Sequence, residues 1–187
     1  MILKINIDSK LVIKIGGEMK VKRRRQSGRK AQSSHVSIPT CYGSDAPYYY
    51  YEVEPHERKS RFNLTSDTCI MDNEYYFIRG CLEIPILNYP ETFIWDVWVS
   101  ISEENYQKVI RGWNERDREN EDPYFGWLST SIPGYPETLN LKTNIHIREI
   151  GVKPFIELEP TEHPLAIEQR KGITFDRVRK IKDAIQQ

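Results

Sequence analysis

The chain has 187 residues, with 27 basic and 27 acidic side chains and a formal net charge of zero. Its hydrophobic fraction of 39% is typical of a globular chain and excludes an intrinsically disordered one. No apolar run reaches the roughly 18 residues that cross a bilayer, and charged residues interrupt residues 1–15, so we expect neither a membrane span nor a secretory leader.

The zero net charge hides an uneven distribution. Residues 1–34 contain 10 Lys and Arg against two acidic residues, which leaves 17 basic and 25 acidic residues for 35–187. We therefore expect a basic N-terminal extension at 1–34, disordered or partly a hairpin, and a single domain at 35–187. We expect no binding of nucleic acid except through residues 20–30, where seven basic side chains gather, because an acidic body repels phosphates. With no aromatic residue among them, these side chains are more typical of a solvated arm.

Breakers such as Pro39, Gly43 and Pro47 predict a loop over residues 31–51. The loop ends in four consecutive tyrosines, 48–51, which cannot all point inward, so we expect two of them to line a surface or groove. A short helix is expected to start at Pro55, since proline is tolerated in the first turn.

Residues 64–101 predict two or three antiparallel strands. In residues 93–101, alternation puts one set of side chains on a core face and the other on a mixed face: Phe93, Trp95, Val97, Val99 and Ile101 against Ile94, Asp96, Trp98 and Ser100. The preceding strand contains Gly80, which indicates either a bulge that swaps the faces or the close approach of another backbone.

The next element is a helix capped by Ser100 or Ser102, with one apolar stripe: Tyr106, Val109, Ile110 and Trp113. Strands are expected at residues 123–132, 139–147 and 155–159. Two C-terminal helices follow: one over 163–171, with Pro164 in its first turn, and one that Thr174 is expected to cap. This order predicts an α+β fold, with a single antiparallel or mixed sheet on which one mid-chain helix and two C-terminal helices pack.

Long strings of this sequence resemble a bacterial family of domains of unknown function, DUF2199, over about residues 55–173. The strings are LTSDTCIMD, FIRGCLEIPI, FIWDVWVSIS, YFGWLSTSIPGYPETLNLKT and IELEPTEHPLAIEQRKGI. The resemblance implies a small bacterial protein and no particular activity. Family members often begin with a C-x-x-C-G-x-x-H zinc knuckle, but Gly28 and Ala31 occupy the cysteine positions here, so we predict no metal and no cofactor.

The first candidate site is catalytic. Glu157 and Glu159 share one face of a strand, and His163 begins the next helix, so two carboxylates and an imidazole could serve a metal-assisted hydrolase. Such an enzyme requires Asp67 or Asp72 in the same pocket. The alternative is that both glutamates face solvent and His163 only caps its helix.

The second candidate is a binding surface. Trp98 shares a face with Asp96, and large aromatics beside polar side chains suit interfaces; Arg79, Glu83 and Trp127 complete the predicted set. Arg79 is also expected to hold a carboxylate inside the fold.

Three cysteines, Cys41, Cys69 and Cys81, form neither an even framework nor a C-x-x-C pair, which predicts free thiols in the cytoplasm. The leading hypothesis is a non-catalytic protein-interaction module with a basic protein partner. A bacterial immunity-type protein fits that description by analogy only.

Overall fold

The computed structural model describes residues 2–3 and 40–186. The expected basic extension at 1–34 therefore lies outside the described residues, apart from β1 (Ile2–Leu3), which pairs with β2 (Cys41–Ser44). No helix in the described ranges is long and apolar enough to cross a membrane.

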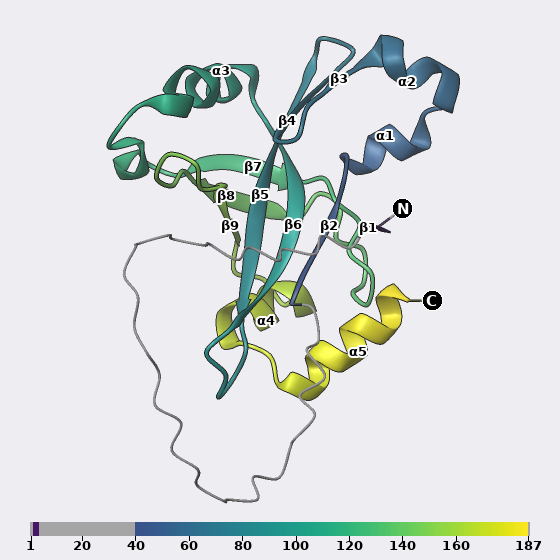
Figure 1. The fold of residues 1–187 in the computed structure, drawn as a ribbon, viewed down its shortest axis with the longest axis vertical. Helices are drawn as coiled ribbons and strands as arrows, with labels where there is room; N and C mark the ends of the chain where they lie inside the picture. Colours follow the sequence, from purple (N-terminus) through teal and green to yellow (C-terminus); the bar gives the residue numbers. More distant parts are fainter. Residues whose placement is uncertain (1, 4–39, 187) are drawn as a thin grey trace, which may run out of the picture.

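One mixed sheet of nine strands organises the fold (Figure 1). After β1 it contains β2 (Cys41–Ser44), β3 (Phe62–Leu64), β4 (Thr68–Met71), β5 (Tyr75–Pro85), β6 (Thr92–Ile101), β7 (Tyr124–Leu128), β8 (Lys142–His146) and β9 (Phe155–Leu158). The order is β1-β2-β6-β7-β8-β9-β5-β4-β3, and β5 also pairs with β6. Strands β5 to β9 therefore close into a barrel.

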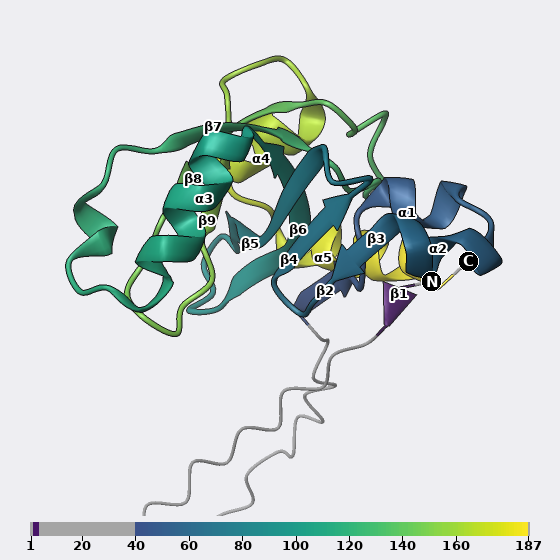
Figure 2. The same ribbon diagram turned by 90° about the horizontal axis from the view of Figure 1, so that it is seen from above.

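Helices cover both ends of the long β5–β6 pair: α1 (Tyr48–Glu52), α2 (Pro55–Arg61), α3 (Glu103–Arg111), α4 (Pro164–Lys171) and α5 (Phe175–Ile185). Figure 2 shows β5 and β6 passing between α3 on one side and α1 and α2 on the other. The predicted α+β fold, with a mixed sheet, a mid-chain helix and two C-terminal helices, is confirmed.

The β5–β6 pair has one continuous register, from Tyr76 opposite Ile101 to Pro85 opposite Thr92. The faces are therefore not swapped at Gly80. A Cβ atom built on Gly80 would lie 2.8 Å from the carbonyl oxygen of Pro154, which immediately precedes β9. The close approach of another backbone is thus the correct interpretation of this glycine.

The predicted core face of β6 is buried inside the barrel, as expected from its alternation. Side chains from β5, β7, β8, β9 and the three later helices complete this core, including Ile78, Leu128, Ile145, Ile156, Leu165 and Ile181. Ser102, not Ser100, caps α3: its hydroxyl accepts a hydrogen bond from the backbone N–H of Asn105 at 3.2 Å.

Three expectations differ from the structure. Residues 31–51 are not all loop, because β2 and α1 form within them; the guanidinium of Arg58 hydrogen-bonds the carbonyls of Tyr51 and Val53 and holds the end of α1. Ile110 is exposed, since α3 buries only a narrow stripe. The strand expected at 123–132 spans only Tyr124–Leu128: the backbone N–H of Ser129 still bonds the carbonyl of Trp98, but the N–H of Trp98 bonds the hydroxyl of Thr130 and not a backbone carbonyl.

Candidate functional site

The outer face of the β5–β6 pair carries most of the residues predicted to bind a partner. Arg79 and Asp96 project from it and form a buried ion pair, with Arg79 Nη2 and Asp96 Oδ2 3.0 Å apart. The guanidinium also lies over the ring of Trp98, 5.7 Å from its centroid. The expectation that Arg79 holds a carboxylate inside the fold is therefore confirmed.

The same burial contradicts the expectation that Trp98, Asp96 and Arg79 form part of a binding surface. Trp98 is fully buried, and its indole N–H donates to the carbonyl of Ser44 at 3.0 Å. Asp96 also accepts a hydrogen bond from Lys153 Nζ at 2.7 Å. Residues from β2, from the first helix and from the loop before β9 thus cover this part of the face.

Glu83 lies farther along β5 and pairs with Arg148, whose Nη1 is 2.7 Å from Glu83 Oε1. Both side chains are partly exposed. Glu83 therefore reaches the surface, but its charge is already balanced.

Trp127 is the predicted binding residue that the structure leaves open. It lies opposite Ser100 in the β6–β7 pairing, and its ring meets that of Phe125 edge to face, with centroids 5.1 Å apart. Tyr75, Phe125 and Trp127 are 48%, 43% and 39% exposed. These three, with Tyr89, are the exposed aromatics of the described residues, so three of the four gather in one place.

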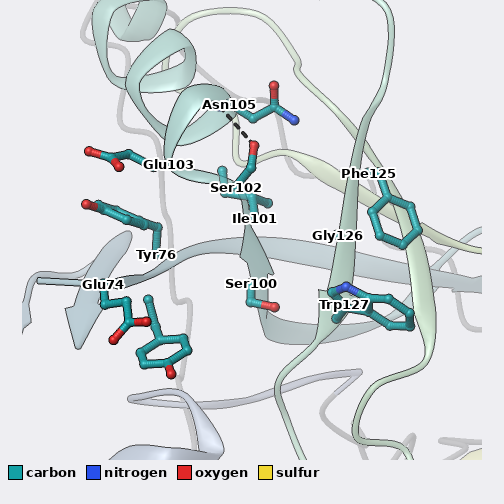
Figure 3. A pocket seen from close by; sticks show the side chains of 11 residues that line it. Glu74, Tyr76, Ser100, Ile101, Ser102, Glu103, Asn105, Phe125, Gly126 and Trp127 are labelled. Atoms are coloured by element: carbon teal, nitrogen blue, oxygen red, sulfur yellow. Dashed lines mark hydrogen bonds between the residues drawn. The ribbon is translucent and has the colours of Figure 1, made fainter. Parts of the chain in front are cut away.

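They surround a pocket of about 470 Å³ at the end of β5, β6 and β7, which we call the aromatic groove (Figure 3). Its charged lining side chains are both carboxylates, Glu74 and Glu103, and no Lys, Arg or His lines it. The remaining lining residues are Tyr76, Ser100, Ile101, Ser102, Asn105 and Gly126.

Two local structures place the carboxylates. Glu74 ends a tight turn between β4 and β5 in which Asp72 and Asn73 both adopt positive φ, 53° and 56°, and the backbone N–H of Glu74 donates to the carbonyl of Met71. Glu103 is the first residue of α3, where a negative charge is favourable. Burial raises the pKa of Tyr76 above its usual value, and the neighbouring Glu103 raises it further.

A glycine brings β7 close to β6 beside the groove. A Cβ atom on Gly126 would lie 2.7 Å from the carbonyl oxygen of Ser100. Only glycine fits this contact, and strand alternation places the side chains on either side of it, Phe125 and Trp127, together on the opposite, exposed face.

A second pocket, of about 510 Å³, adjoins the aromatic groove and shares Glu74, Tyr75 and Ser100 with it. Its other walls are Tyr49, Met71 and Phe77, with the ion pair of Arg61 and Asp72. Of the four consecutive tyrosines, two of which were expected to line a surface or groove, Tyr49 lines this pocket.

The residues of the predicted hydrolase lie elsewhere. Glu157 hydrogen-bonds His146, with Oε2 and Nε2 2.9 Å apart, and Glu159 lies 3.9 Å from Lys142 Nζ. His163 caps α4, because its Nδ1 accepts from the backbone N–H of Leu165.

The two aspartates expected beside these residues are engaged in other interactions. Asp67 bonds the hydroxyl of Ser66, and Asp72 lines the second pocket, whereas Glu157 lines a different one. In the described part of the chain, no three His, Cys, Asp or Glu side chains are grouped so that they could hold a metal ion. The arrangement gives the metal-assisted hydrolase no geometric support.

All three cysteines are free thiols. Burial raises the pKa of Cys69 to about 12 and raises those of Cys41 and Cys81 as well. A nucleophilic cysteine needs the opposite shift, so these thiols are poor candidates for catalysis.

Sequence reasoning missed Glu74, Tyr75 and Glu103, since the turn before β5 and the start of α3 come near Trp127 only when β5, β6 and β7 pair in the folded chain. The sequence did contain one sign of this groove, which is the pair of aromatic residues, Phe125 and Trp127, on either side of Gly126.

Comparison with known proteins adds a family and no activity. No curated protein and no solved structure matches the chain. The model of one bacterial family matches residues 29–173, which extends the resemblance upstream of residue 55. The chain therefore belongs to the family described as "Uncharacterized protein conserved in bacteria (DUF2199)".

Proposed function

We propose that the protein is a non-catalytic binding module that docks a basic segment of a partner protein in the aromatic groove. The observation that carries the proposal is the composition of that groove: three exposed aromatic side chains and two carboxylates, with no basic residue in the lining. Exposed aromatics are enriched where proteins bind one another.

Charge complementarity selects the partner. Glu74 and Glu103 form no ion pair with any residue of the described ranges, and residues 35–187 carry eight more acidic than basic residues, 25 against 17. A basic segment would supply the missing positive charge and would be steered toward this surface. The free thiols fit a cytoplasmic site of action.

The test uses the full chain and two pools of short dye-labelled peptides with the same apolar residues, one rich in Lys and Arg and the other rich in Glu. We expect the basic pool alone to raise the fluorescence anisotropy on binding. Trp127→Ala should weaken that binding by roughly tenfold or more, since a central aromatic often contributes about 2 kcal/mol.

Tyr89→Ala is the matched control, because it removes an aromatic of similar exposure, 42%, that does not line the groove. It should bind the basic pool like the native chain. Equal binding of both pools, or binding that does not change in Trp127→Ala, would show that the groove is not the docking site.

A further inference from the structure

The two kinds of wall in the aromatic groove face each other. In Figure 3, Glu103 and Glu74 lie on one side of Ser100 and Ile101, with Tyr76 between them, and the rings of Phe125 and Trp127 lie on the other. A ligand side chain in this space therefore meets carboxylates on one side and aromatic rings on the opposite side.

The described residues show in four places which side chain both pairs with a carboxylate and lies over an aromatic ring. Arg79 pairs with Asp96 while its guanidinium lies over Trp98. Away from this face, Arg177 Nε lies 2.8 Å from Glu168 Oε1, and its guanidinium carbon lies 4.8 Å from the ring centroid of Tyr135. Arg148 pairs with Glu83 and lies over Phe155, and Arg179 pairs with Asp176 and lies over Phe175. In all four places the cation is an arginine.

Resting on the proposed function, we propose that the groove is specific for arginine over lysine: it binds a partner segment by one arginine side chain inserted between the carboxylates and the rings. A guanidinium is planar, forms paired hydrogen bonds with a carboxylate and stacks on an aromatic face. An ammonium is compact and more strongly hydrated, so it makes poorer use of the aromatic wall.

The adjoining pocket indicates what lies next to that arginine. Its walls include Tyr49, Met71 and Phe77, and its one ion pair, Arg61 with Asp72, is already neutral. Because the two pockets share Glu74 and Tyr75, a segment leaving the first enters the second directly. The recognised segment therefore carries an apolar residue beside its arginine.

The test compares three synthetic peptides that are identical except at one position next to a leucine, where they carry arginine, lysine or citrulline. Citrulline keeps the shape of arginine and loses its charge. Calorimetric titration of the full chain should give the arginine peptide a roughly tenfold tighter Kd than the lysine peptide, and the citrulline peptide the weakest binding. Equal affinity for arginine and lysine, or for arginine and citrulline, would overturn the inference.

Two variants locate the selectivity. Glu103→Gln and Trp127→Ala should each reduce the ratio of arginine to lysine affinity severalfold, whereas Glu149→Gln, an exposed carboxylate outside the groove lining, should leave it unchanged. If neither variant alters the ratio, the groove does not select the guanidinium.

The outcomes also separate this inference from the proposed function. If no basic peptide binds, both are wrong. If lysine and arginine peptides bind equally and both depend on Trp127, the docking function holds and the arginine selectivity is wrong. The triple variant Arg23→Gln, Arg24→Gln and Arg25→Gln lacks the arginine cluster of the chain itself, which could compete with the peptides for the groove. It should bind the three peptides in the same order of affinity.

Discussion

The outer face of the β5–β6 pair has two parts that differ in burial although they share strands and side-chain parity. In one part, Phe77, Arg79, Asp96 and Trp98 are buried. In the other, Tyr75 and Ser100 lie beside the exposed Trp127. The difference is the cover: Tyr49 and Tyr50 pack over the first part, and nothing in the described residues closes the second. The same alternating pattern thus forms a small second core or an open groove, depending on which distant segment lies above it.

The two tryptophans of this face give the largest expected contrast. Trp98→Ala should lower the free energy of unfolding by about 4 kcal/mol, because it leaves a cavity and an unpartnered carbonyl at Ser44. Trp127→Ala removes a side chain from the open part and should change it by less than about 1 kcal/mol. Urea denaturation measures both; a similar loss in both variants would mean that the cover over Trp98 contributes little.

The buried ion pair should give the next largest effect. Asp96→Ala leaves the guanidinium of Arg79 buried without its carboxylate and should cost about 3 kcal/mol. This loss is at the lower end of the range for a broken buried ion pair. The reason is that Lys153, the other partner of Asp96, is 35% exposed and can turn toward water.

The control for Asp96→Ala is the double variant Arg79→Met with Asp96→Leu, which removes both buried charges. It should restore most of the free energy of unfolding that Asp96→Ala loses. Glu103→Gln on the open part should change the unfolding free energy by less than about 0.5 kcal/mol. If the double variant is no more stable than Asp96→Ala, unpaired charge is not the cause of the loss.

The cover over the ion pair depends on β9 lying close to β5. A Cβ atom at Gly80 would meet Ile156 Cδ1 at 2.6 Å and would press on Pro154, the residue after Lys153. Gly80→Ala should therefore lower the free energy of unfolding by about 2 kcal/mol, measured by the same urea denaturation. Gly112→Ala is the matched control, since its Cβ would meet nothing closer than 3.9 Å, and a loss there as large as at Gly80 would exclude crowding as the cause.

The sequence correctly predicted those features of the fold that are determined by residues a few positions apart. The alternation of β6, the proline at the start of α4 and the capping role of Thr174 were all readable because each is set within a few positions. Closure of the barrel was not readable, since a single parallel pairing, Cys81 with Phe155, joins strands that are far apart in the sequence.

The candidate site was harder to predict for the same reason. Parity correctly put Trp98 on the face opposite the core and could not show that Tyr49 and Tyr50 would cover this part of the face. Trp127 was identified, but its neighbours Glu74 and Glu103 come from a turn and a helix start that approach it only in the folded chain. Sequence therefore placed side chains on faces, and long-range packing decided which face a ligand can reach.

The smallest expected effect concerns the ion pair at the edge of the open part. The guanidinium of Arg61 hydrogen-bonds Asp72 and holds the pKa of that carboxyl below its usual value of 3.8. Because the folded-state pKa is lowered, the stabilisation is present above about pH 4 and is lost as the pH falls through the folded-state pKa.

Arg61→Gln should return the pKa of Asp72 toward its usual value, as measured by NMR titration of the side-chain carboxyl carbon. The free energies of unfolding of the native chain and the variant should differ slightly at neutral pH and converge in acid. A difference that instead grows below pH 4 would mean that Arg61 acts through some other contact. Because the pair is exposed and screened by salt, the effect should also shrink at high ionic strength, unlike that of the covered Asp96.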